Sequence, residues 1–500
     1  MKWIRRHSVI VLVLTLIVFV YFASRFYGIM DLPMFTDESI YARWTKIARF
    51  DAKERFISLE DGKQPSFIWA AMIVMRFVGE DPLLAGRLVS VFAGFATLIG
   101  IYFLTREFFR SNLAGVLASF LYLIFPMAIV YDRMALYESL VGAFSVWSVF
   151  LIAVLIRTLR LDVALLLGMV LGGGMLTKTS AFFNLYLLPF SLILFDLKEL
   201  HRLKRFAMWF MLATLAGILA FVYYSILRLA PLNYMINQKN AVFVYPFNEW
   251  ITHPFNFFVG NINGQWDWLI TYLTWPLFIL SIVSFLIRSS FTKQKLVLAV
   301  WFFIPFVLLA LFARTLYPRF IFAMAIFLLP LAAATLFEIA NLIKNKVVVI
   351  LLYAILFILP IRVDQMILTN FARSPIPKLD REQYINSWPA GGGIREIIAF
   401  LEQQAKKEKI YVASEGTFGA IATNAVEIYL GDNKNVGRGG IWPLPKGFPD
   451  DLVIKSKTML VYFIFNETQN IPPEWPLSAI ASYRKGVGNS YMRLYQVIPD

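Results

Sequence analysis

Ionisable side chains interrupt a strongly apolar sequence at a few places between long apolar runs. The acidic ones are Asp37, Glu38, Asp132 and Glu138, and the basic ones are Lys63, Arg133, Lys178, Arg314 and Arg319. Charged groups at the boundary of a membrane are costly and tend to be functional. One chemistry suits this set, in which Lys and Arg bind a lipid-linked phosphate while a carboxylate accepts a proton or binds a metal.

Several of these residues also have a purely structural explanation. Asp37 could be the N-cap of a helix that runs through Ile40 and Trp44, with Glu38 in the first turn. Lys63 could extend toward water from the start of an interfacial helix. Capping and catalysis are compatible, so both interpretations stay open for the acidic pair.

The second group lies where two apolar runs meet, near residue 135. Arg133 could pair with Asp132 or with Glu138, which would leave no charge for a ligand. Lys178 differs, because it places a positive charge at an outer boundary, against the usual distribution of basic residues. The preceding glycines, 172–174, allow a close approach of helices.

Metal sites built on histidine or cysteine are disfavoured. The three histidines, His7, His201 and His253, form no pair at metal-ligand spacing. The chain has no cysteine, which excludes disulfides, thiolate catalysis and Cys-type zinc sites. No cofactor is implied with certainty, and a divalent cation held by Asp37 and Glu138 remains possible.

The composition requires a lipid environment. Hydrophobic residues make up 59% and charged residues 16% of the 500 residues, with a mean hydropathy of +0.65. Soluble domains carry about 25% charged residues. The net charge is +15, but Lys and Arg fall in short runs between apolar segments, which argues for anionic membrane lipids and against nucleic acid as a partner.

Apolar runs of about 20 residues predict the membrane-spanning helices. Eleven such runs are found, within a range of 11 to 13: 8–27, 86–105, 113–131, 135–156, 162–177, 180–196, 206–228, 267–287, 296–313, 320–340 and 347–361. The segment 65–79 is short and contains Arg76, and if it crossed, every later basic loop would lie outside. We therefore predict an interfacial or re-entrant helix there, a cytoplasmic N-terminus and an extracytoplasmic C-terminus.

This topology divides the chain into a transmembrane domain, 1–361, and an extracytoplasmic α/β domain, 362–500. The first outer loop, 28–85, carries the acidic pair. Within the tail we predict helices at 394–407 and 419–430 and strands at 409–413, 458–465 and 490–497. The glycines at 391–393 predict a flexible turn before a helix. Asn466 begins an N-glycosylation sequon, which is either used or a chance match.

At these residues the sequence resembles bacterial and archaeal relatives of the dolichyl-phosphate-mannose–protein mannosyltransferases and of lipid A aminoarabinose transferase, which are GT-C type glycosyltransferases. The resemblance covers roughly residues 1–340. The motifs are Asp37-Glu38, Lys63-Gln64-Pro65, Gly86-Arg87-Leu88-Val89-Ser90, the stretch 133–138, and Leu176-Thr177-Lys178. Each is weak alone, but their order and spacing together are specific. Gln64 stands where relatives usually have proline, and Glu138 where some have Asp.

The resemblance implies a polyprenyl-phosphate sugar donor and inverting transfer to a glycan, lipid or protein acceptor. Asp37 would be the general base and Glu38 would orient acceptor or donor. The cations Lys63, Lys178, Arg319 and Arg133 would bind the donor phosphate, and Glu138 and Asp132 would contact the sugar, the acceptor or a metal. Such an enzyme would be a multi-pass protein of the plasma membrane with an extracytoplasmic active site.

Two other functions share some of these features. A transporter or flippase of lipid-linked saccharides would place charges near the middle of the bilayer and often shows inverted repeats, which are not visible here. A polysaccharide polymerase or ligase would use the same donor but would lack the acidic pair of the first loop. The glycosyltransferase interpretation explains more of the residues than either.

Overall fold

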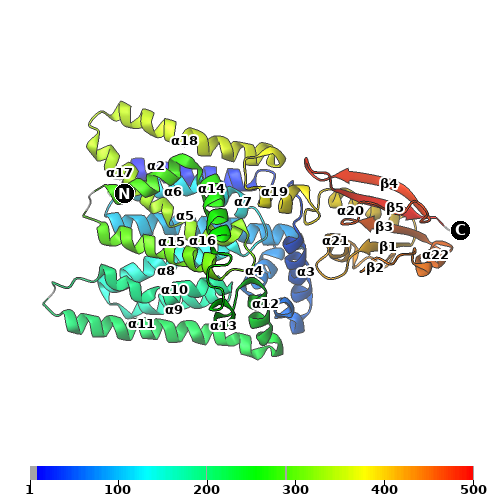
Figure 1. Cartoon of the computed structure of the whole chain (residues 1–500), viewed down its shortest axis with the longest axis horizontal. Helices are drawn as coiled ribbons and strands as arrows, with labels where there is room; N and C mark the ends of the chain where they lie inside the picture. Colours follow the sequence, from blue (N-terminus) through cyan, green and yellow to red (C-terminus); the bar gives the residue numbers. More distant parts are fainter. Residues whose placement is uncertain (1–7, 199, 288–289, 499–500) are drawn as a thin grey trace. The chain divides into compact units, whose positions relative to one another are not determined.

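The computed structural model describes residues 8–198, 200–287 and 290–498, and Figure 1 shows its elements. Four basic residues next to predicted spans, Lys2, Arg5, Arg6 and Arg288, lie outside the described residues. Contacts divide the chain into two compact units. The first is made of Met1–Tyr27, Phe56–Ala70 and Arg87–Thr369, and the second of Gly28–Arg55, Ala71–Gly86 and Asn370–Asp500.

The first unit is helical. Its main helices are α2 (Ser8–Phe26), α5 (Pro82–Phe109), α6 (Asn112–Leu123), α7 (Pro126–Tyr131), α8 (Glu138–Thr158), α9 (Leu161–Met175), α10 (Phe182–Tyr186), α11 (Arg202–Tyr224), α12 (Met235–Phe243), α13 (Phe247–Trp250), α14 (Phe258–Leu286), α15 (Thr292–Phe312), α16 (Phe322–Ala325), α17 (Leu328–Leu342) and α18 (Lys346–Thr369). The shorter 3-10 helices η2 (Ile57–Asp61), η4 (Leu188–Leu194), η6 (Pro231–Tyr234) and η7 (Pro318–Ile321) lie in the connections.

Among the described residues, seven helices are long and apolar enough to cross a membrane, and a pair bent by 46°, Pro318–Ala325 with Leu328–Leu342, makes an eighth candidate. Each of the eleven predicted spans coincides with one helix or with consecutive helices of this unit. The chain is therefore a multi-pass membrane protein. Helix α4 (Ser66–Met75) covers most of the segment predicted to be interfacial, and its ten residues are about half the length that a span needs.

Small residues let α9 lie close to its neighbours. A Cβ atom at Gly168 would approach the Leu219 side chain to 2.8 Å, and one at Gly172 would approach Tyr223 of α11 to 2.6 Å. A Cβ atom at Gly173 would approach the Phe144 ring of α8 to 2.7 Å. Figure 1 shows α9 beside α11, and this tight packing fixes the end of α9 that Lys178 follows.

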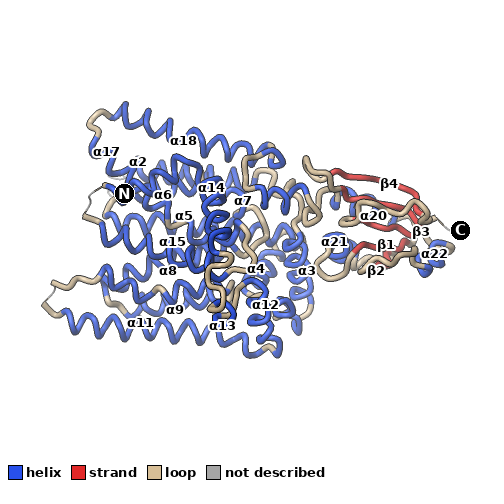
Figure 2. Tube along the Cα trace, in the orientation of Figure 1, coloured by secondary structure: helices blue, strands red, loops and turns tan. Residues whose placement is uncertain are grey.

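The second unit contains a five-stranded sheet with the order β2-β1-β3-β5-β4, shown in red in Figure 2. The strands are β1 (Ile410–Glu415), β2 (Val436–Ile441), β3 (Leu460–Phe465), β4 (Leu477–Arg484) and β5 (Tyr491–Val497). β1 pairs parallel with β2 and β3, and β5 pairs antiparallel with β3 and β4. Buried aromatic residues from β3, Phe463 and Phe465, pack with Trp475 in its core.

Helices complete the second unit: α3 (Thr36–Phe50), α19 (Lys378–Arg381), α20 (Ile394–Ala405), α21 (Ile421–Leu430) and α22 (Asp450–Ser456). The predicted helices at 394–407 and 419–430 are confirmed within two residues at each end. Figure 1 draws the sequence-distant helices α3 and α21 next to each other, and they are in contact. The segment 28–55 therefore contributes a helix to the same unit as the tail.

Candidate functional site

An acidic and two basic residues gather in the first unit where α8, α9 and η7 begin or end. Lys178 follows α9, and its Nζ donates to Glu138 Oε1 at 2.6 Å, at the start of α8. The same Nζ lies 4.7 Å from the centre of the Phe320 ring. The guanidinium of Arg319, in η7, lies over the rings of Tyr317 and Phe320 at 4.9 and 5.7 Å. Aromatic faces attract cations in this geometry.

Hydrogen bonds bring the segment with Lys63 to the same place. Gln64 Nε2 donates to Thr179 Oγ1 at 2.8 Å, next to Lys178. The Tyr137 hydroxyl, next to Glu138, donates to the carbonyl oxygen of Gln64 at 3.1 Å. Gln64, which departs from the proline usual in the resembling family, thus makes a side-chain contact that proline could not make. We call three basic residues, Lys63, Lys178 and Arg319, the cation cluster, and we include Glu138 in it because its carboxylate accepts the hydrogen bond of Lys178.

Helix α12 adds a cation that the sequence did not single out. Lys239 of α12 donates to Asp61 Oδ1 at 2.5 Å. The Nζ atoms of Lys63 and Lys239 lie 5.8 and 5.9 Å from the centre of the same Phe243 ring. The only sequence signal was a lysine within a loop rich in aromatics. Arg314, a candidate above, instead pairs with Glu249.

A groove of about 1010 Å³ runs along α11, and its other walls come from α10, η4, the 3-10 helix η5 (Ser225–Leu229), η6 and α12. Its lining is mainly apolar and aromatic, but Arg228, Asn233 and Asn237 also line it. Two other lining residues, Leu227 and Ile236, belong to a buried cluster that includes Leu59 and Leu176. Leu176 is two residues from Lys178, so the groove reaches the neighbourhood of the cation cluster.

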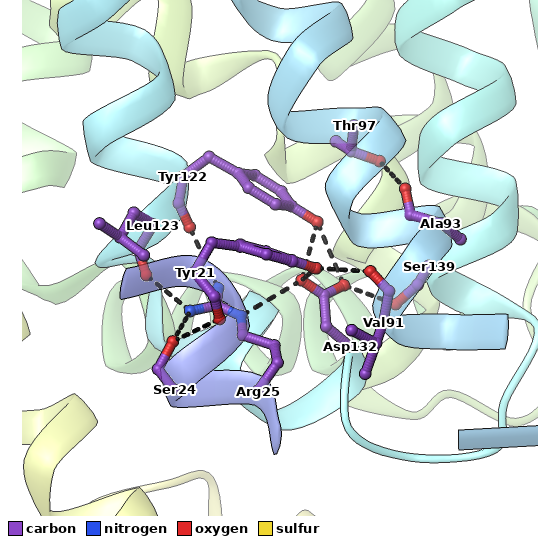
Figure 3. A network of polar contacts seen from close by, with 10 residues as sticks. All are labelled: Tyr21, Ser24, Arg25, Val91, Ala93, Thr97, Tyr122, Leu123, Asp132 and Ser139. Carbon is purple, nitrogen blue, oxygen red and sulfur yellow. Dashed lines mark hydrogen bonds and ion pairs between the residues drawn. The ribbon is translucent and has the colours of Figure 1, made fainter. Parts of the chain in front are cut away.

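Asp132 lies in a fully buried polar network, shown in Figure 3. Its carboxylate accepts hydrogen bonds from the hydroxyls of Tyr122, at 3.1 Å, of Ser139, at 2.8 Å, and of Tyr21, at 3.2 Å. It also forms an ion pair with Arg25 at 3.7 Å. The acidic partners of the cations are therefore Asp132 for Arg25 and Glu138 for Lys178.

Arg133 and the residues of α2 complete this region. Arg133 is 2% exposed and donates from Nη2 to the backbone carbonyl of Tyr27 at 2.6 Å. Tyr21 and Arg25 were not predicted to take part in any site. Their signal is a spacing of four residues, which places both polar groups on one side of an otherwise apolar helix.

Asp37 and Glu38 belong to the second unit, in the first turn of α3. The N-cap is Phe35, so the interpretation of Asp37 as N-cap is wrong. Glu38 is fully buried and accepts a hydrogen bond from the Phe35 backbone N–H at 3.0 Å, closing the first turn. Asp37 is half-buried at the positive end of the helix dipole, which favours a negative charge.

The residue types bear on whether a divalent cation fits. Among the residues that the structure describes, no group of three or more His, Cys, Asp or Glu lies close enough to hold a metal ion. In the cation cluster, one of the two Glu138 oxygens, Oε1, already accepts a hydrogen bond from Lys178. These side chains match an anionic ligand better than a cation.

The comparisons with known proteins agree with this architecture. Residues 63–226 match the family model of the dolichyl-phosphate-mannose–protein mannosyltransferases. The crystal structure of ArnT from Cupriavidus metallidurans bound to undecaprenyl phosphate is similar, with a TM-score of 0.60, 12% identity and 98% of each chain covered. The archaeal oligosaccharyltransferase AglB from Archaeoglobus fulgidus, in complex with an inhibitory peptide and dolichol phosphate, has a TM-score of 0.53 and 12% identity over 93% of this chain and 70% of its own.

A comparison with curated proteins found no match. The family model covers the segment with Lys63, Glu138 and Lys178, and the two structures match 98% and 93% of this chain. The chain therefore has the same fold as ArnT and AglB, and its residues 63–226 resemble the dolichyl-phosphate-mannose–protein mannosyltransferases.

Proposed function

We propose that the protein transfers a sugar from a polyprenyl-phosphate donor to an acceptor on the extracytoplasmic side of the plasma membrane, with inversion at the sugar. The observation that carries this proposal is the cation cluster beside an apolar groove. Lys178 and Arg319 lie on aromatic faces of one short segment, and hydrogen bonds of Gln64 hold the loop of Lys63 against them. This arrangement suits a ligand with an anionic head and a hydrocarbon tail.

The chemistry of the donor explains why cations are needed. When the sugar leaves its carrier, the bond between the anomeric carbon and a phosphate oxygen breaks, and the phosphate takes the bonding electrons. Positively charged hydrogen-bond donors stabilise that developing charge, so no separate general acid is required. We assign this role to Lys63, Lys178 and Arg319, and Arg133 is kept as a further candidate.

Glu138 holds Lys178 in place before the donor binds. Their hydrogen bond of 2.6 Å keeps the Nζ of Lys178 at the N-terminal end of α8, where it would meet the phosphate. The second Glu138 oxygen would then contact the sugar. For Asp132 we now favour an anchoring role over contact with the sugar or a metal, because its oxygens accept three hydroxyl hydrogen bonds inside the helix bundle.

A single displacement with inversion needs one base to take the proton of the acceptor. We propose Asp37 for this role. Glu38, beside it, is engaged in closing the first turn of α3, so it supports the position of Asp37. A positioned general base contributes typically 10²- to 10⁴-fold to such a reaction.

The groove along α11 would hold the isoprenoid chain of the donor. Most of its lining belongs to the helical segment Arg202–Leu229, which is long and apolar enough to cross a membrane, and Arg228, Asn233 and Asn237 supply polar groups. Undecaprenyl phosphate bound to ArnT and dolichol phosphate in complex with AglB support a donor of this class. The acceptor would be a glycan, a lipid or a protein.

Binding of the carrier lipid tests the proposal. We expect purified protein to bind polyprenyl phosphate more tightly than polyprenol, because only the phosphate meets the cation cluster. Lys178→Met should weaken polyprenyl phosphate binding by roughly ten- to a hundredfold, since a hydrogen bond to a charged group is worth about 1.5–3 kcal/mol. Arg157→Met is the control, because Arg157 pairs with Glu107 at the other end of α8 from Glu138.

The contrary outcomes are distinct. If the protein bound polyprenol and polyprenyl phosphate equally, the cation cluster would not be a phosphate site. If Lys178→Met and Arg157→Met weakened binding by the same factor, the effect would come from general charge rather than from the cluster.

A further inference from the structure

The first turn of α3, which carries Asp37, is fastened to the C-terminal part of the second unit by backbone hydrogen bonds on both sides. The Thr36 N–H donates to the carbonyl of Pro389 at 3.0 Å. The Gly391 N–H donates to the carbonyl of Met34 at 2.7 Å, and Phe35 and Ala390 form an antiparallel bridge. The segment before α20 therefore holds the chain entering α3.

The glycine at 391 is needed for this contact. A Cβ atom there would lie 2.7 Å from the Met34 carbonyl oxygen, which is closer than side-chain carbons approach. At Gly393 the backbone has φ +94°, and it is the N-cap of α20. The glycines at 391–393 thus form the predicted turn before a helix, and Gly391 lets this turn lie against Met34, two residues before the start of α3.

A buried side-chain relay joins the same turn to α21. Asn424 is 1% exposed, and its Nδ2 donates to Ser39 Oγ at 3.0 Å. Ser39 Oγ in turn donates to the carbonyl of Thr36 at 2.7 Å. The relay thus ends on the residue immediately before Asp37, so a substitution of Asn424 would change the position of that turn.

Further along α3, charged residues extend the contact. Arg43 Nε donates to Glu427 Oε2 at 2.7 Å. Lys46 Nζ donates to the carbonyl of Ile428 at 2.6 Å. Ser39, Arg43 and Lys46 are spaced by four and three residues, so they share one side of the helix.

Asp37 lies on a different side of α3 from this contact. At 3.6 residues per turn, it is about 200° around the helix from Ser39. The face that binds α21 and the face with the carboxylate are therefore separate.

We propose that the C-terminal α/β domain is a positioning module for the catalytic base, and that Asn424 is its main positioning residue. The inference rests on the proposed role of Asp37. An isolated helix of 15 residues is marginal in water, so α3 needs a rigid partner to hold one orientation. A shift of about 1 Å in a reacting group can cost about a hundredfold in rate.

The test compares Asn424→Ala with Asn435→Ala in the full-length protein. Asn435 lies in the same domain, and its side chain donates to the carbonyl of Ala405 instead of to α3. We expect Asn424→Ala to lower kcat at least tenfold, with the affinity for polyprenyl phosphate unchanged, because the cation cluster belongs to the other unit. Asn435→Ala should leave kcat within about twofold.

A charge exchange provides a second readout. Arg43→Glu and Glu427→Arg alone should each lower kcat, and the double variant should recover most of it, because the ion pair is restored in reverse. A purely structural loss would lower the amount of folded protein in all three variants without this recovery.

The outcomes separate this inference from the proposed function. If Asp37→Asn abolishes transfer but Asn424→Ala and the single charge variants keep full kcat, the positioning role is refuted and the base remains. If Asp37→Asn keeps full activity, the base assignment itself fails. A parallel loss of kcat and of polyprenyl phosphate affinity in Asn424→Ala would also contradict the inference.

Discussion

Replacing Asp132 by Asn should destabilise the first unit more than removing both members of its ion pair. Asp132→Asn keeps the size of the side chain but removes the negative charge that faces Arg25 at 3.7 Å. Arg25 is fully buried, so its charge would remain inside the helix bundle without its nearest carboxylate. Breaking one partner of a buried pair costs about 3–5 kcal/mol in soluble proteins.

Other contacts of Arg25 place the expected loss of stability near the lower end of this range. Arg25 would still donate to the carbonyl of Leu123 at 2.9 Å and to Ser24 Oγ at 3.0 Å. The new amide keeps one oxygen that can accept from the surrounding hydroxyls. We therefore expect a loss of about 3 kcal/mol for Asp132→Asn.

The double variant is the sharper part of this prediction. Adding Arg25→Met to Asp132→Asn removes the uncompensated charge and fills its space with an apolar chain, so stability should partly return. The measurement is the free energy of unfolding in mixed micelles for the wild type, both single variants and the double variant. If the two losses simply add, Arg25 and Asp132 are not energetically coupled and the anchoring role of this network is refuted.

Three further predictions follow from other parts of the chain. A Cβ atom at Gly94 would lie 2.3 Å from the Asp132 carboxylate, so Gly94→Ala should lower the free energy of unfolding by about 1–3 kcal/mol. Gly260→Ala is the control, because the Cβ position of Gly260 is in open space and the substitution should not destabilise the protein. Unfolding in micelles compares the two variants. Burial lowers the pKa of Lys485 to about 7 from its ordinary 10.5, so between these values the unfolded chain binds more protons and stability rises with pH. Relative to Lys485→Gln, the wild type should gain up to about 1.4 kcal/mol per pH unit in that window, and a constant difference would contradict this. Lys178→Cys, in a chain without other cysteines, should react with membrane-impermeant thiol reagents added from the extracytoplasmic side, and labelling only from the cytoplasm would overturn the orientation.

The spans and the regular part of the tail could be predicted from the sequence because they depend on local patterns. Apolar runs determine where helices cross a membrane, and β3, with its run of Val461 to Phe465, is strongly β-prone. Strands β2 and β4 were missed. β2 contains three glycines among its six residues, and most of β4 is exposed or half-exposed, so neither shows the alternation of a buried strand.

Only part of the candidate site could be predicted from the sequence, because the site depends on contacts between residues that are distant in the chain. The motifs located Lys63, Glu138 and Lys178. A hydrogen bond joins Lys178 to Glu138, and two hydrogen bonds of Gln64, next to Lys63, join it to Thr179 and Tyr137. Asp132 looked equally promising, because nothing in the sequence indicates that Arg25, more than 100 residues earlier, faces it. The contact between Ser39 and Asn424 spans 385 residues and leaves no local signal.

The central claim is that Asp37 removes the acceptor proton while separate cations hold the donor phosphate. The most direct measurement is the release of polyprenyl phosphate from a panel of polyprenyl-phosphate sugars, with donor affinity determined in parallel for the wild type and Asp37→Asn. We predict that the wild type consumes a donor of the panel, and that Asp37→Asn binds this donor with the same affinity but releases no polyprenyl phosphate. Unchanged turnover by Asp37→Asn, or a loss of donor affinity equal to its loss of turnover, would contradict the account.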